Sequence, residues 1–133
     1  MSKRPKYGNT KVVLDGITFD SKNEAARYGY LRELEDAGVI SNLRRQVEYE
    51  LIPRQTKMVV KQLKTKTKMV ERLAEHPVHY RADFVYDKGP DTIVEDVKGS
   101  YITATPDFRI KKKLMLYVHG IEIHIINNPK QQV

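Results

Sequence analysis

The stretch from residue 80 to residue 98 constrains the fold most, because it contains two strand-like runs separated by a very short connection. Apolar and polar residues alternate in the first run, which predicts a strand whose core face carries Tyr80, Ala82, Phe84 and Tyr86. The second run, Thr92–Lys98, is rich in β-branched residues, which favour strands. The connection between them contains glycine and proline and is typical of a tight turn. The sequence therefore predicts an antiparallel hairpin.

The short turn favours a register in which Asp87 pairs with Thr92, and this register places Asp83 opposite Asp96. Directly opposed residues point to the same face of a sheet, with Cβ atoms about 4.5–5.5 Å apart. Two carboxylates at that separation repel each other, so such a pair would not stabilise the fold by itself. A divalent cation removes the objection, because Mg²⁺ is held by oxygen ligands that include one or two carboxylates. The pair therefore indicates a metal site.

Lys98 supports this register because it lies two residues beyond Asp96 and hence on the same face of the strand. A shift of one residue would place Glu95 opposite Asp83 instead. The side chain of Glu95 would then point to the face opposite to that of Lys98. We therefore expect Asp83, Asp96 and Lys98 to form the site.

Two helices are indicated by their capping residues. Ser21 is a good N-cap, and Glu24 follows three residues later, which makes a capping box and accounts for Glu24 without any function. Gly38 is a natural end for this helix. The second helix is predicted to begin at Thr105, with proline at its first helical position, and to stop at Gly120.

Further strands are predicted over Lys11–Phe19, as a strand or a hairpin, over Leu43–Ile52 and over Ile121–Ile126. The order is then β-α-β-β-β-α-β, an α/β (α+β) domain with a mixed sheet. The Leu43–Ile52 strand is expected to pair beside the hairpin, which would bring Gln46 and Tyr49 near the site.

Length and composition favour a single intracellular domain. The chain has 133 residues, which suits one hydrophobic core, and it contains no cysteine, which excludes disulfides and thiolate metal sites. No apolar run approaches the roughly 20 residues that span a bilayer. We expect a basic flexible arm over residues 1–10, one domain over residues 11–133 and a cytoplasmic location.

The net charge of +7 indicates a polyanionic partner, and nucleic acid is the commonest. The positions of the basic residues along the chain are more informative than the net charge. A basic insertion at about residues 54–72 contains seven basic residues and one acid, and its Lys64–Lys68 run is expected as an exposed hairpin tip or loop. A second cluster lies on the predicted second helix, at Arg109 and Lys111–Lys113.

The segments Tyr80–Phe84 and Val94–Gly99 together resemble the PD-(D/E)XK nuclease signature, with Ala82 where the name has proline. The segment Phe19–Glu24 is similar to the first-helix motif that supplies this superfamily's additional glutamate. The order Ser-x-x-Glu, Asp-Phe and acid-x-Lys-Gly is similar to that of small phage nucleases, including Holliday-junction resolvases of the endonuclease I type. The resemblance implies a restriction-endonuclease-like mixed sheet flanked by helices.

The resemblance also implies roles for individual residues. Asp83, Asp96 and the Val97 carbonyl would ligate Mg²⁺, for which Mn²⁺ would substitute, and Glu24 would complete the site. Lys98 would orient or deprotonate the attacking water, or stabilise charge on the phosphorus. The implied reaction is phosphodiester hydrolysis that leaves a 5′-phosphate.

The implied substrate is branched DNA, and because a resolvase cuts two opposed strands we expect a homodimer. The basic residues expected to contact DNA are Arg81, Lys64, Lys66, Lys68, Arg109, Lys111, Lys112 and Lys113. Two alternatives stay open: a duplex- or nick-directed nuclease of repair, transposition or restriction type, and a non-catalytic nucleic-acid-binding protein that keeps the fold.

Overall fold

The computed structural model describes residues 11–99 and 105–133, and the predicted hairpin lies at its centre. Strands β6 (Val78–Lys88) and β7 (Asp91–Val97) are antiparallel, and Asp87 pairs with Thr92 as the turn predicted. Gly89 in the turn has a φ of 59°, a conformation that glycine adopts without steric cost. The pairing of β6 with β7 ends at Phe84 and Glu95. Asp83 and Asp96 directly follow this last pair in the same register.

The hairpin is the middle of a four-stranded mixed sheet in the order β3-β6-β7-β8. Strand β3 (Ser41–Ile52) runs antiparallel to β6, and the short β8 (His124–Ile126) runs parallel to β7. The mixed α+β class predicted from the sequence is therefore confirmed. The expected basic arm over residues 1–10 lies outside the described residues.

Two helices cover opposite faces of this sheet. Helix α1 (Lys22–Asp36) packs Ala25, Tyr28 and Leu31 into a core cluster with Phe84 and Tyr86 of β6. Helix α2 (Pro106–His119) packs Phe108 and Met115 into a second cluster with Val85 and Val94, which point the other way. Both helices begin where their caps predicted, because the Ser21 and Thr105 hydroxyls each accept a backbone N–H. Gly120 ends α2 with a φ of 67°, as predicted, whereas α1 ends at Asp36 with Ala37 as its C-cap, one residue before the predicted Gly38. None of the helices in the described ranges is long and apolar enough to cross a membrane.

The element order has more strands than the sequence predicted. The Lys11–Phe19 segment is a hairpin of two short strands, β1 (Val12–Leu14) and β2 (Ile17–Phe19), which form a separate sheet. The basic insertion contributes β4 (Gln55–Gln62) and β5 (Thr67–Glu75). The observed order is therefore β-β-α-β-β-β-β-β-α-β.

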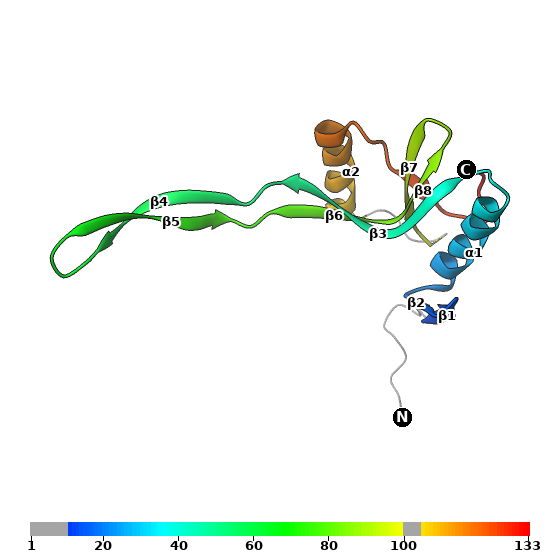
Figure 1. Cartoon of the computed structure of the whole chain (residues 1–133), viewed down its shortest axis with the longest axis horizontal. Helices are drawn as coiled ribbons and strands as arrows, with labels where there is room; N and C mark the ends of the chain where they lie inside the picture. Colours follow the sequence, from blue (N-terminus) through cyan, green and yellow to red (C-terminus); the bar gives the residue numbers. More distant parts are fainter. Residues whose placement is uncertain (1–10, 100–104) are drawn as a thin grey trace, which may run out of the picture.

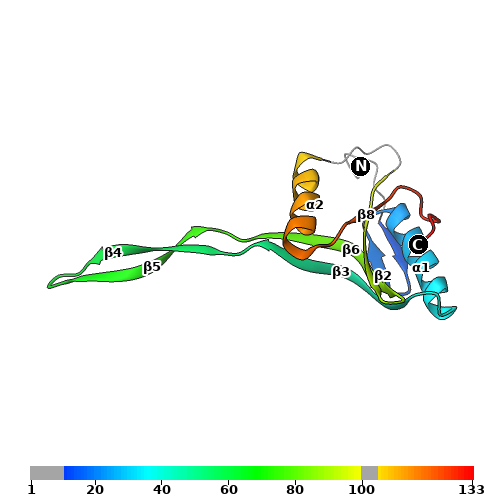
Figure 2. The ribbon, with the colours of Figure 1, turned by 90° about the horizontal axis from the view of Figure 1, so that it is seen from above.

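Strands β4 and β5 form a two-stranded arm that projects far from the body of the molecule (Figure 1, left). The view from above shows the same ribbon leaving the sheet as a continuation of β3 and β6 (Figure 2). Every residue from 53 to 76 is exposed except for three half-buried ones, Val59, Leu63 and Val70. The Lys64–Lys68 run lies at the tip, where the Leu63 N–H donates to the Lys66 carbonyl at 2.8 Å.

The prediction of one continuous apolar face on β6 is wrong in one respect. All four predicted residues are buried, but Tyr80 and Ala82 pack in the α2 cluster, whereas Phe84 and Tyr86 pack in the α1 cluster. Strict alternation would keep them on one face. The alternation breaks at Asp83, which lies opposite Gln46 of β3; the φ of Gln46 is 52°. As a result, residues of β6 on the two sides of Asp83 pack in different core clusters.

A buried ion pair joins α1 to β7. Arg27 is 0% exposed and Glu95 is 1% exposed; the Arg27 Nε donates to Glu95 Oε1 at 2.8 Å and its Nη2 to Oε2 at 2.5 Å. The Tyr86 hydroxyl donates to the same carboxylate, and Arg27 Nη1 donates to the carbonyls of Pro129 and Gln131. Burial opposes the charge of Arg27, but hydrogen bonds and charge from Glu95 raise its pKa. The pair therefore ties together α1, the hairpin and the C-terminal segment.

We predict that Arg27→Met destabilises the fold by about 3–5 kcal/mol, because it leaves the Glu95 carboxylate buried without its cation. Equilibrium denaturation in urea at pH 7 measures the loss. Arg32→Met is the matched control, because Arg32 lies on the same helix but pairs with Glu35 at the surface, where solvent screens the pair and its loss should change stability little. Equal losses in the two variants would contradict a structural role for the buried pair.

Candidate active site

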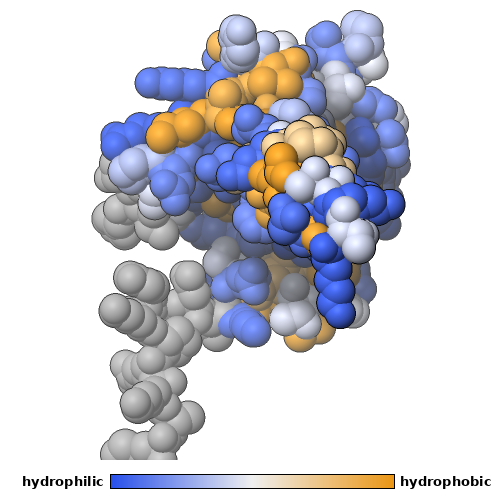
Figure 3. Space-filling view, turned by 90° about the vertical axis from the view of Figure 1, so that its left-hand side faces the viewer, coloured by the Kyte–Doolittle hydropathy of each residue, from blue (hydrophilic) through white to orange (hydrophobic). Residues whose placement is uncertain are grey.

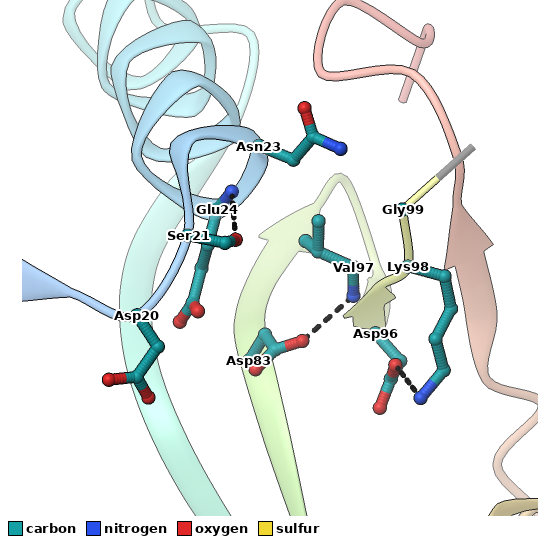
Figure 4. Close-up of a pocket in the computed structure, with 9 residues that line it drawn as sticks. All are labelled: Asp20, Ser21, Asn23, Glu24, Asp83, Asp96, Val97, Lys98 and Gly99. Carbon is teal, nitrogen blue, oxygen red and sulfur yellow. Dashed lines mark hydrogen bonds and ion pairs between the residues drawn. The ribbon is translucent and has the colours of Figure 1, made fainter. Parts of the chain in front are cut away.

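A pocket of about 360 Å³ opens where the N-terminus of α1 meets the middle of β6 and the end of β7. Helix α1 supplies one wall and β7 supplies another, as Figure 4 shows. The described residues that line it are Asp20, Ser21, Asn23, Glu24, Asp83, Asp96, Val97, Lys98 and Gly99. All the predicted catalytic and metal-ligating residues are therefore among those that line one pocket.

Glu24 enters the pocket from the first turn of α1. Its backbone N–H donates to the Ser21 hydroxyl at 3.1 Å, which is the N-cap interaction expected from the sequence. Its carboxylate accepts a hydrogen bond from Gln46 Nε2 at 3.0 Å and points toward the space beside Asp83 (Figure 4). The N-cap interaction thus accounts for the position of the Glu24 backbone, whereas its side chain points into the pocket and is held there by Gln46. Burial, the main cause, raises the pKa of this carboxyl; the charge of Arg45 opposes the rise, and the charges of Asp20 and Asp96 add to it.

Asp83 is anchored by the opposite strand. Its Oδ2 accepts a hydrogen bond from the Val97 N–H at 2.8 Å, and its Oδ1 lies 3.5 Å from Gln46 Nε2. Burial raises the pKa of the Asp83 carboxyl to about 7; the Val97 N–H opposes this, and the charges of Asp96 and Glu24 add to it. A carboxylate crowded by two others gains from a neighbouring cation.

Asp96 is surrounded by donors. Its Oδ2 accepts from the Tyr80 hydroxyl at 2.8 Å, and its Oδ1 pairs with Lys98 Nζ at 2.9 Å. The Lys98 ammonium also lies 3.9 Å from the ring centroid of Phe108, so α2 holds it from the far side. Asp96 and Lys98 thus share a face as predicted, and Glu95 points to the opposite face, where it meets Arg27.

The structure adds three polar residues to those that the sequence singled out for the site. Asp20 and Asn23 line the pocket on either side of the N-cap, and the Tyr80 hydroxyl holds Asp96 although the pattern predicted Tyr80 only as core. Asp20 directly precedes the N-cap, which is the one sequence signal that could have found it. Gln46, which we expected near the site, reaches both Glu24 and Asp83 through its amide. Tyr49 packs against the α2 cluster instead.

The charges in the pocket are unbalanced. Of the described residues that line it, four carry carboxylates, and Lys98 is the one cation. Among the residues that the structure describes, no three carboxylate or histidine side chains converge into a ready-made metal site. This arrangement still fits Mg²⁺, which usually keeps several waters and is bound by one or two carboxylates together with substrate phosphates.

The residues predicted to contact DNA lie on three separate surfaces outside this pocket. Arg81 is exposed on β6, where its Nη2 lies 3.9 Å from Glu48 of β3. Lys64, Lys66 and Lys68 lie at the far end of the arm (Figure 1). The remaining residues are on α2, where three of them help to line a second pocket of about 290 Å³: Arg109, Lys112 and Lys113. Lys111 is on the same helix.

The chain belongs to the family described as "Protein of unknown function (DUF1064)", whose model matches residues 4–131. No curated protein and no solved structure matches the chain.

We predict that Asp83→Asn stabilises the metal-free protein at pH 8 by roughly 1–3 kcal/mol. The raised pKa means that the folded state keeps a proton that the unfolded chain releases, so this group's contribution to stability falls as the pH rises from about 4 through about 7. The gain should therefore shrink as the pH is lowered toward 4. Urea denaturation in EDTA across this range measures it.

The control is Asp91→Asn, which removes an exposed carboxylate from the same hairpin. It should leave the pH profile of the wild type unchanged. A pH profile for Asp83→Asn that parallels the wild type would contradict the crowded environment described for Asp83.

Proposed function

We propose that the protein is a Mg²⁺-dependent DNA endonuclease of the PD-(D/E)XK superfamily. The observation that carries the proposal is that Glu24, Asp83, Asp96 and Lys98 line one pocket, although they come from three different elements of the chain. An acid-x-Lys triplet is weak evidence alone, because charged residues make up 31% of the chain. It gains weight from a second carboxylate on the neighbouring strand and a third on the helix.

The residues that would hold Mg²⁺ are Asp83, Asp96, the Val97 carbonyl and Glu24. When bound, the ion supplies Lewis-acid polarisation of a phosphate oxygen and lowers the pKa of water. The excess of carboxylates in the pocket supports this assignment, because burial and mutual repulsion raise the pKa of both Glu24 and Asp83. Mn²⁺ has the same preference for oxygen ligands and is expected to substitute.

The reaction is hydrolysis of a phosphodiester. Water attacks the phosphorus, the bond from phosphorus to the 3′ oxygen breaks, and the products are a 5′-phosphate and a 3′-hydroxyl. Lys98 is placed to orient the water or to stabilise the negative charge that develops on the phosphate oxygens. Its contacts with Asp96 and the Phe108 ring keep the ammonium at the pocket rather than in solvent. The Tyr80 hydroxyl and the Val97 N–H fix the two strand carboxylates without adding charge.

The finer proposal is that the substrate is branched DNA, cut by a homodimer in the manner of a phage resolvase. The basic α2 residues, including Arg109 and Lys111–Lys113, and Arg81 would then contact the backbone around the cut. The proposed alternative is a nuclease of duplex or nicked DNA. The other alternative is a protein that binds nucleic acid without cutting it. The exposed lysines of the arm formed by β4 and β5 support binding of nucleic acid, which this alternative shares with the nuclease.

We predict that the purified protein cuts DNA with Mg²⁺ but not in EDTA, and that Asp83→Asn, Asp96→Asn and Lys98→Ala each lower the rate at least 100-fold. A gel assay on labelled DNA measures the rate, and religation of the products by DNA ligase checks for the 5′-phosphate. Lys88→Ala is the control, because Lys88 lies at the turn of the same hairpin and its ammonium contacts the C-terminal residue. Full activity in either aspartate variant would show that the site is wrongly assigned.

The same assay separates the substrate classes. A four-way junction, a nicked duplex and an intact duplex are compared at equal concentration. Paired symmetric cuts in the junction support resolution by a dimer, and an equal rate on intact duplex rules it out in favour of the alternative nuclease. Binding without cleavage under Mg²⁺ and Mn²⁺ would favour the non-catalytic protein.

A further inference from the structure

The arm formed by β4 and β5 has two chemically different faces, which only the register reveals. Paired residues of an antiparallel ribbon point to the same face, and successive pairs alternate. The pairs Lys57↔Arg72, Val59↔Val70 and Lys61↔Lys68 therefore lie on one face. The hydrogen bond from Leu63 to Lys66 continues the same register to the tip.

We call this the basic face of the arm and define it by Lys57, Lys61, Lys66, Lys68 and Arg72. The opposite face carries apolar and uncharged residues and one acid, Glu71. Between residues 57 and 72 there are six basic residues, of which five lie on the basic face and Lys64 lies in the turn. Charge needed for solubility alone would not have to be sorted to one side of a ribbon that is exposed on both.

The basic face is also the better packed of the two. The three half-buried residues of the arm, Val59, Leu63 and Val70, all lie on it, in line with lysine stems that cover apolar surface while their ammonium groups stay in water. On the other face Met58, Val60 and Met69 are each more than half exposed. Figure 3, which views the molecule from the side on which the arm projects, shows exposed hydrophobic residues among hydrophilic ones.

The dimensions of the basic face suit a nucleic-acid backbone. From the pair at Lys57 to the pair at Leu63 the ribbon advances six residues, or roughly 20 Å at about 3.4 Å per residue. Duplex DNA carries about one charge per 1.7 Å of its axis, so a dense row of phosphates is available over that length. A two-stranded ribbon is also an element that the major groove admits.

We propose that the basic face of the arm binds the phosphate backbone of duplex DNA, at a distance from the pocket. The identity of the polyanion as DNA rests on the proposed function. The arm would hold a duplex segment while the pocket acts on a phosphodiester elsewhere in the same substrate. The apolar face does not contact the DNA in this arrangement.

The test measures binding of the full-length protein to a labelled duplex by fluorescence anisotropy in EDTA, where no cleavage occurs, over a series of salt concentrations. The variant Lys57→Gln/Lys61→Gln/Lys68→Gln removes three charges from the basic face. It should lower the affinity roughly 10- to 100-fold at 0.1 M salt and reduce the slope of log affinity against log salt by about 2–3. The conservative variant with arginine at the same three positions should keep the wild-type slope.

Two control variants are matched to the triple glutamine variant of the basic face. Lys11→Gln/Lys88→Gln/Lys130→Gln removes the same charge from exposed positions off the arm, and Met58→Thr/Val60→Thr/Met69→Thr changes three residues on the opposite face of the arm. Both should keep the salt slope within about 1 of the wild type. Thermal melting of each variant checks the fold.

An equal loss in the off-arm control would overturn the proposal, because binding would then follow net charge alone. An equal loss in the apolar-face variant would also overturn it, and a smaller mass for that variant in sedimentation would identify a second copy of the chain as the partner of the arm. Failure of the proposed function is distinguishable, because a protein that never cuts DNA can still show this binding, and an active nuclease can lack it.

Discussion

The buried pair of Arg27 and Glu95 is the interaction on which the rest of the site depends. Burying two charges costs several kcal/mol per ion, and here the cost is offset by the bidentate geometry together with Tyr86 and two backbone carbonyls. Arg27 lies three residues after Glu24, so both side chains project from the same side of α1. Glu95 lies beside Asp96 but on the other face of β7. The pair therefore fixes the distance between a helix and a strand that each carry one carboxylate of the pocket.

Local chemistry explains why much of this arrangement could be predicted from the sequence. The hairpin turn is so short that it leaves one register, and that register alone puts Asp83 next to Asp96. The caps at Ser21 and Thr105 depend on residues within a single turn of helix. Each of these predictions uses contacts between residues close in sequence. Their agreement with the structure indicates that local preferences and the global fold are consistent around the pocket.

The features that could not be predicted all depend on contacts between distant residues. An arginine in a helix is typical of an exposed face, and nothing near Arg27 indicates that it is fully buried against a strand and the C-terminal segment. The positive φ of Gln46 belongs to no glycine or turn motif, yet Gln46 lies opposite Asp83, where the alternation of β6 breaks, and its amide reaches both Glu24 and Asp83. The arm was predicted only as a basic insertion with an exposed hairpin tip or loop at Lys64–Lys68, because its residues bury little surface and therefore show no hydrophobic periodicity.

The two facing carboxylates of the hairpin are not equivalent, and this bears on where a cation would act. Asp96 is compensated by the Lys98 ammonium and the Tyr80 hydroxyl. Among the described residues, Asp83 receives neutral N–H donors, from Val97 and more distantly from Gln46, and the charges of Asp96 and Glu24 raise the pKa of its carboxyl further. Of the two strand carboxylates, Asp83 is therefore the less compensated. A cation bound beside Asp83 would relieve this repulsion, in keeping with the metal-ligating roles proposed for Asp83, Asp96 and Glu24.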